Sequence, residues 1–193
     1  MFVMGIDPGL SRCGYGVVER DPAARSGMRA VTAGVITTPT DQPTGHRLAA
    51  LAREAQALLA EFDPAVVAVE RVLFQSNART AMAVGQASGI FLAAAAEHGA
   101  ELVEYSPNEV KMAVTGYGAA DKTQVQAMVA TILGLAEVPR PPDVADALAL
   151  AICHIGRAPL ARRAALAAAG WRVRTGQAVG RPDPVGGPGG PVS

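Results

Sequence analysis

The stretch FVMGIDPG, residues 2–9, decides the fold of this chain. Its first five residues form an apolar run typical of a buried strand. The run ends at Asp7-Pro8-Gly9, where proline and glycine favour a tight turn. The segment GYGVV at 14–18 follows as a second apolar run. We therefore expect a hairpin in which Asp7 lies at the end of the first strand.

Further strands and helices follow the hairpin along the chain. We expect three more strands, over 28–36, 65–69 and 101–105. Helices are expected over 45–62 with Thr44 as its N-cap, over 78–97, from Ser106-Pro107, after Asp121, and from about Pro142 to Ala168. Hairpins first and crossovers later predict an α/β fold with a mixed five-stranded sheet flanked by helices.

The domain organisation follows from where apolar residues occur. They recur through residues 1–168, which we expect to form one domain, whereas 169–193 is a Gly/Pro/Arg-rich tail that we expect to be disordered. No uncharged apolar run reaches the roughly 18 residues that a membrane span needs. No basic segment precedes an apolar core at the N-terminus. We therefore expect a cytoplasmic protein with no membrane association.

The distribution of charge and the placement of the cysteines limit which metal-binding and DNA-binding sites the chain can form. The formal net charge is zero, but the six arginines between 157 and 181 leave eleven cations against sixteen acids in the first 156 residues, a net charge of −5. Cys13 and Cys153 lie in no zinc-spacing motif, and we expect both as buried thiols. Any metal site must therefore use carboxylates, and any DNA-binding function must bring this negative charge to DNA through cations.

Four acids stand where such a site would form. Asp7 ends the first strand and Glu70 follows the strand at 65–69, and functional groups gather at the carboxyl ends of central strands. Asp143 and Asp146 are three residues apart, so a helix carries them on one face. If the two strands are neighbours, the four carboxylates share one cleft. Such a cluster suits two hard cations about 3.5–4 Å apart that act on a phosphodiester.

Each acid also has an ordinary structural explanation. Asp7 before Pro8-Gly9 is typical of a turn, and Glu70 at a strand end is typical of a solvated residue. Asp143 after two prolines is typical of a helix N-cap or first turn. Only the combination points to chemistry.

That combination resembles the RuvC family of bacterial Holliday-junction resolvases, in the RNase H-like superfamily. The resemblance covers residues 1–156 and is carried by MGIDPGLSRCGYGVVE at 4–19, VAVERVLFQSNARTAMAVGQASG at 67–89, YSPNEVKMAVTGYGAADKTQVQAMV at 105–129 and PPDVADALALAICH at 141–154. It implies an RNase H-like nuclease domain. The family's catalytic, metal-binding tetrad falls on Asp7, Glu70, Asp143 and Asp146, with two Mg²⁺ per active site and Mn²⁺ as a substitute.

The resemblance also implies a substrate and partners. Its members are homodimers that cut four-way junction DNA with paired symmetric nicks, in recombination and repair, beside a branch-migration motor complex. Lys111 and Lys122 match family lysines near the DNA; the alternative is that both are ordinary solvated surface lysines. Arg79, with Arg71 and Asn77, follows Glu70 and is expected near phosphate. Phe74 is the expected base-stacking residue. The alternatives are that Phe74 folds back onto the core, or that Leu73 occupies the stacking position.

Two other functions fit parts of the pattern. A strand followed by Asp-x-Gly and a hairpin also opens actin-like and sugar-kinase-type ATPases, which duplicate the fold and are longer than this chain. A non-catalytic junction-binding protein would keep the fold but not the acids. ATP binding without cleavage would favour the first, and junction binding without cleavage the second.

Overall fold

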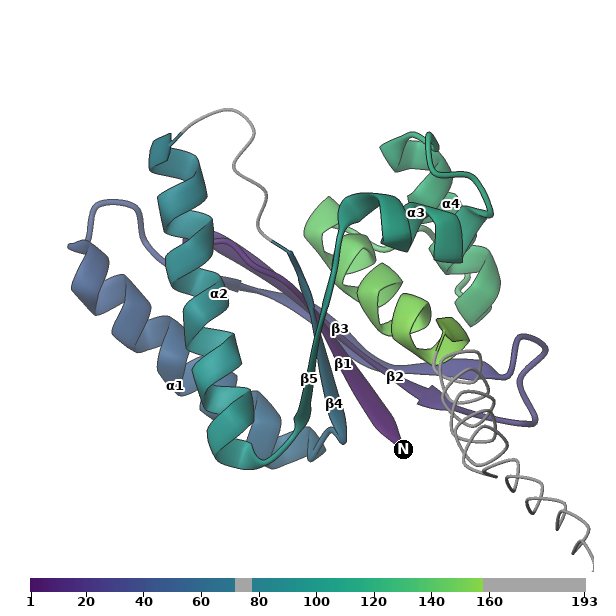
Figure 1. Cartoon of the computed structure of the whole chain (residues 1–193), viewed down its shortest axis with the longest axis horizontal. Helices are drawn as coiled ribbons and strands as arrows, with labels where there is room; N and C mark the ends of the chain where they lie inside the picture. The colour runs from purple at the N-terminus through teal and green to yellow at the C-terminus, as the bar shows by residue number, and fades with distance from the viewer. Residues whose placement is uncertain (72–77, 158–193) are drawn as a thin grey trace, which may run out of the picture. The chain divides into compact units, whose positions relative to one another are not determined.

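The computed structural model describes residues 1–71 and 78–157, except for the side chains of 78–80. Its centre is one five-stranded sheet in the order β3-β2-β1-β4-β5 (Figure 1). The strand bounds are Phe2–Asp7 for β1, Arg12–Arg20 for β2, Met28–Thr37 for β3, Val66–Glu70 for β4 and Glu101–Tyr105 for β5. β1 runs antiparallel to β2 and parallel to β4, which runs parallel to β5. The predicted mixed five-stranded sheet is confirmed.

The helices cover both faces of this sheet. They are α1 (Thr44–Phe62), α2 (Ala78–His98), α3 (Pro107–Thr115), α4 (Lys122–Leu133) and a last helix over 142–157. Figure 1 shows α1 and α2 on one side, and α3, α4 and the 142–157 helix, in pale green, on the other. The predicted continuation of the last helix to Ala168 and the tail at 169–193 lie outside the described residues. None of the described helices is long and apolar enough to cross a bilayer.

The strands send alternate side chains into two separate cores. Met4 and Ile6 of β1 pack with Val67 of β4 against α1 and α2. The next residues along the same strands, Val3 and Ala68, pack instead against α3, α4 and the 142–157 helix. This is the two-residue period of a strand that is buried on both faces.

The 142–157 helix packs unusually close to the sheet. A Cβ placed on Gly5 would lie 1.9 Å from the carbonyl oxygen of Ala147 and 2.9 Å from the amide nitrogen of Ala151. One placed on Gly14 would lie 2.1 Å from the carbonyl oxygen of Asp143. At these two glycines the helix packs directly on strand backbone, which brings residues 143–151 over β1 and β2.

Two of the three predicted helix caps are confirmed. Ser106 accepts from the Glu109 amide and Asp121 from the Gln124 amide, and each completes a capping box. The prediction for Thr44 is wrong, because Thr44 is the first residue of α1 and Pro43 is the N-cap. The extended Pro43 has no side-chain oxygen to offer, so its carbonyl alone accepts from the first amides of the helix. Cys13 and Cys153 are buried free thiols, as expected.

Candidate active site

Asp7 and Glu70 lie side by side at the carboxyl end of the sheet. The parallel pairing of β1 and β4 reaches Ile6 and Val69, and the next residue of each strand is the acid. Ile6 and Val69 face α1 and α2, so both acids face the 142–157 helix. That helix contributes Asp146, and the glycine contacts on β1 and β2 set how close it comes.

These acids line one cavity together with both predicted lysines. The cavity has a volume of about 340 Å³ and is lined by three acids, two lysines and five other residues: Asp7, Glu70, Asp146, Lys111, Lys122, Pro107, Val110, Val125, Ala149 and Leu150. Its charged groups therefore come from β1, β4, α3, α4 and the last helix. The structure brings together side chains that lie far apart in the sequence.

Asp143 is placed differently from the other three acids. It does not line the cavity, and its Oδ2 accepts from the guanidinium of Arg12 at 2.8 Å from Nη2 and 3.2 Å from Nε. It is still close enough for its charge to raise the pKa of Asp7. Sequence reasoning missed Arg12, because no local pattern links position 12 to position 143.

Lys122 is paired with an acid of the cavity. Its Nζ lies 2.7 Å from Oδ2 of Asp146. This hydrogen bond is the main reason that the pKa of Lys122 is raised, and the charges of Asp146, Asp7 and Asp143 add to it. Lys122 is the first residue of α4, so the Asp121 capping box that begins this helix also positions the lysine.

Burial, together with repulsion between the acids, raises the pKa of two of them. Burial, followed by the charges of Glu70, Asp146 and Asp143, raises the pKa of Asp7 to about 7. Burial and the charge of Asp146 also raise the pKa of Glu70. The metal-free cavity therefore favours the protonated form of Asp7 more than solvent does. Bound cations would relieve the same repulsion.

The donor set suits a hard divalent cation. Carboxylate oxygens are the ligands that Mg²⁺ prefers. Within the described part of the chain, no three acidic, histidine or cysteine side chains converge on one point in this conformation. Two of the four acids instead contact a cationic side chain, Asp143 through Arg12 and Asp146 through Lys122. A bound cation would compete with Arg12 and Lys122 for these two carboxylates.

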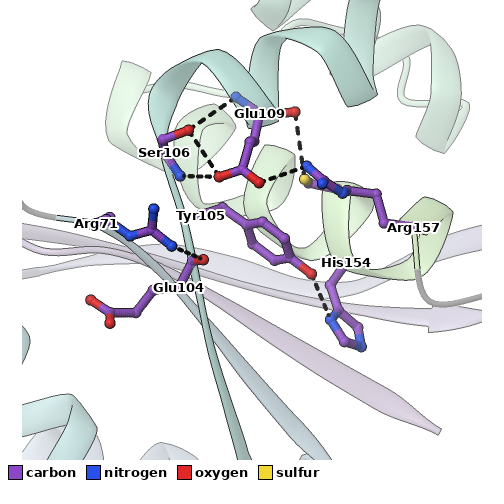
Figure 2. A network of polar contacts seen from close by, with 8 residues as sticks. Arg71, Glu104, Tyr105, Ser106, Glu109, His154 and Arg157 are labelled. Atoms are coloured by element: carbon purple, nitrogen blue, oxygen red, sulfur yellow. Dashed lines mark hydrogen bonds and ion pairs between the residues drawn. The ribbon is translucent and has the colours of Figure 1, made fainter. Parts of the chain in front are cut away.

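A polar network fixes the elements that carry Lys111 and Asp146 (Figure 2). The Tyr105 hydroxyl lies 3.0 Å from Nδ1 of His154, and the Arg157 guanidinium stacks 5.6 Å from the centre of the Tyr105 ring. Arg157 also pairs with Glu109 at 3.0 Å. These contacts join the end of β5, the first turn of α3 and the last turns of the 142–157 helix.

The remaining predicted DNA contacts are only partly described. Phe74, Leu73 and Asn77 lie outside the described residues, as does the side chain of Arg79. The Arg71 amide donates to the carbonyl of Tyr105 at 2.8 Å, and the Arg71 guanidinium donates to the carbonyl of Glu104 at 3.2 Å. Figure 2 shows the latter contact, which holds Arg71 against the end of β5.

Comparison with known proteins agrees with this geometry. The family model described as crossover junction endodeoxyribonuclease RuvC matches residues 3–154. The crossover junction endodeoxyribonuclease RuvC of Leifsonia xyli is 53% identical over 159 residues, 82% of this chain and 76% of that protein. That of Saccharopolyspora erythraea is 50% identical over 169 residues, 88% and 84% of the two chains.

A solved structure supports the same relationship. Thermus thermophilus RuvC in complex with Holliday junction substrate superimposes with a TM-score of 0.78 and 38% identity, over 83% of this chain and 96% of that one. The family match spans both strand-end acids and the 143–146 pair. The chain therefore belongs to the RuvC family of crossover junction endodeoxyribonucleases.

Proposed function

We propose that this chain is a structure-selective endonuclease that resolves four-way (Holliday) DNA junctions by paired symmetric nicks, in DNA recombination and repair. One observation carries the proposal: in a chain of the RuvC family, three acids and two lysines from five separate elements line one cavity. A cluster of this kind has no structural role that apolar residues would not fill better, because buried like charges destabilise the fold.

The four acids are the proposed catalytic and metal-binding residues. Asp7, Glu70 and Asp146 line the cavity, and Asp143 joins them when it leaves Arg12. Mg²⁺, with two ions in each site and Mn²⁺ as a substitute, would supply an activated water and stabilisation of the leaving oxygen. The chain itself holds the carboxylates at the ends of paired strands and on a helix packed against them.

The two cavity lysines have a separate proposed role. Lys122 balances the charge of Asp146 in the free enzyme, and both it and Lys111 can donate hydrogen bonds to a DNA phosphate that enters the cavity. Arg79 is proposed to contact phosphate beyond Glu70, and Phe74 to stack on an unpaired base at the branch point. The position of both residues shortly after Glu70 in the sequence supports these two assignments.

The proposal extends to the assembly. A four-way junction presents two equivalent strands, so a homodimer with two sites cuts both symmetrically. The family resemblance adds a branch-migration motor complex as a partner. In the chain itself, 1–168 is the proposed nuclease domain and 169–193 a Gly/Pro/Arg-rich tail that adds non-specific attraction to DNA.

Cleavage of a labelled four-way junction in Mg²⁺, beside a duplex of the same sequence, tests the function. We expect paired nicks at symmetric positions on the junction, ends that a ligase can seal, and little cutting of the duplex. ATP binding without cleavage would instead support an actin-like ATPase. Junction binding without cleavage in any divalent metal would support a non-catalytic binding protein.

A further inference from the structure

Arg12 is the cation closest to the acid that lies outside the cavity. Two of its guanidinium nitrogens, Nη2 at 2.8 Å and Nε at 3.2 Å, donate to one oxygen of Asp143. The pair is partly exposed, with 49% of the Arg12 side chain and 27% of the Asp143 side chain accessible to solvent. Arg12 itself does not line the cavity, whereas Lys111 and Lys122 do. It is therefore placed to act on Asp143 rather than on a bound phosphate.

The position of Arg12 is fixed from two sides. Before it in the chain, the Thr38 hydroxyl donates to the carbonyl of Leu10, and Arg47 donates to the Thr38 hydroxyl at 3.0 Å and to the Ser11 hydroxyl at 2.6 Å. After it, the backbone at Gly14 packs directly on the carbonyl of Asp143. Because α1 holds the turn and β2 touches the 142–157 helix, the pair is built into the fold and differs from a chance surface contact.

A guanidinium also differs from a proton as a partner for an acid. It is a permanent cation, and two of its N–H groups hold the carboxylate in one orientation. A divalent cation that needs Asp143 must displace these hydrogen bonds and approach a fixed positive charge. The exchange costs part of the free energy that the metal gains from the carboxylate.

We propose that Arg12 is a resident counter-cation of Asp143 that competes with the divalent metal for this carboxylate and so sets the metal concentration that the enzyme needs. Arg12 is a positioning residue in this role, because it acts through Asp143. The inference rests on the proposed metal-dependent function.

Mn²⁺ binding to the full-length protein without DNA tests this inference, with free Mn²⁺ measured by electron paramagnetic resonance. Removing the cation in Arg12→Gln should lower the Mn²⁺ dissociation constant about two- to fivefold, the range expected for a partly exposed ion pair. Arg12→Met should do the same, which excludes a special effect of the glutamine amide. Arg12→Lys should stay within about twofold of the wild type.

The chain offers a matched control. Arg29 of β3 pairs with Glu19 and is similarly exposed, but Glu19 lies near the end of β2 that is opposite to the acids. Arg29→Gln should leave Mn²⁺ binding unchanged. In an Asp143→Asn background, the substitution Arg12→Gln should also have no effect, because the carboxylate for which Arg12 competes is gone.

The outcomes separate this inference from the proposed function. Equal or weaker Mn²⁺ binding by folded Arg12→Gln, beside normal binding by the wild type, would overturn the inference and leave the nuclease proposal intact. An equal gain in the Asp143→Asn background would also overturn it, by showing that Arg12 acts through general charge alone. Absence of Mn²⁺ binding in the wild type would overturn the metal-dependent function and the inference with it.

Discussion

The two faces of the sheet are built from opposite kinds of residue. The face toward α1 and α2 is filled by large buried side chains, among them Met4, Ile6 and Phe91. The face toward the 142–157 helix has glycines on β1 and β2 where the helix backbone makes contact. The first face supplies volume and stability. On the second face, which we call the close-packed face, the glycines have no side chain. The 142–157 helix can therefore approach the strands closely and bring its acids near Asp7 and Glu70.

The largest expected effect is a loss of junction cleavage when the acids of the cavity are replaced. Asp7→Asn, Glu70→Gln or Asp146→Asn should each reduce junction cleavage by about a thousandfold or more, because the amide keeps the shape but loses the charge that a metal needs. Junction binding in Ca²⁺ should largely survive, since phosphate contacts elsewhere carry docking. Gel assays of cleavage and binding measure the two activities.

An acid outside the site provides the control for that series. Asp63, which ends α1 and pairs with His98, should tolerate Asp63→Asn with normal cleavage. Cleavage by Asp7→Asn at a near wild-type rate would remove the four acids from the mechanism.

Substitutions on the face covered by α1 and α2 should lower the stability of the protein and have little effect on its activity. Phe91 is completely buried against β1, β4 and α1, so Phe91→Ala should lower the free energy of unfolding by about 3–5 kcal/mol. The folded fraction should cut junctions at close to the normal rate, because the acids face the other way. Urea unfolding and cleavage below the transition measure both. A folded variant that lost cleavage would show that the faces are not independent.

The close-packed face should respond in both stability and activity. An added methyl in Gly5→Ala meets the Ala147 carbonyl at 1.9 Å, so the helix must move away. We expect a loss of about 2–3 kcal/mol in the free energy of unfolding and a clear loss of cleavage, since Asp146 moves with the helix. Gly45→Ala is the control, because open space surrounds Gly45 in α1. Normal cleavage by Gly5→Ala would show that close packing of the 142–157 helix on β1 is not needed to position Asp146.

The acids should also make stability depend on pH in the metal-free protein. Asp7 has a pKa of about 7 when folded and a lower one, near its ordinary value, when unfolded. The folded state therefore binds the proton more tightly, and this stabilisation is present at low pH and lost as pH rises through 7. Unfolding in EDTA should show a loss on the order of 2 kcal/mol between pH 5 and pH 8. Asp7→Asn should flatten this dependence, and an unchanged slope would contradict the raised pKa.

The smallest effect is expected from deletion of the C-terminal segment, which we assign to neither face of the sheet. Deleting residues 171–193, which lie outside the described residues, removes three arginines: Arg172, Arg174 and Arg181. Fold and cleavage should persist, with a modest loss of junction affinity at low salt that shrinks as salt rises. Binding titrations at two ionic strengths measure it. A truncated protein that failed to fold or cut would show that the segment is integral.

The sequence predicted the features that depend on neighbouring residues. Asp7 and Glu70 each stop an apolar run, so their places at strand ends were visible, and the caps at Ser106 and Asp121 follow from three-residue patterns. The prediction for Thr44 failed because the backbone, rather than the residue type, decided that Pro43 begins the helix.

Contacts between elements that are far apart in the sequence could not be predicted in this way. The pair between Arg12 and Asp143 joins residues 131 positions apart. The contact of Gly5 with Ala147 depends on where the last helix lies, and so does the bond between Tyr105 and His154. Single glycines and charged residues give no local signal of such partners.

The late position of the 142–157 helix in the chain also has a consequence for biosynthesis. Asp7 is made first, and Asp146 follows 139 positions later. A growing chain emerges and folds from its N-terminus, so the contacts of the 142–157 helix with β1 and β2 are among the last to form. A chain that ends before this helix lacks Asp143 and Asp146 and cannot complete the cavity. We expect an unfinished chain to be unable to cut DNA until the helix that carries the last two acids has been made.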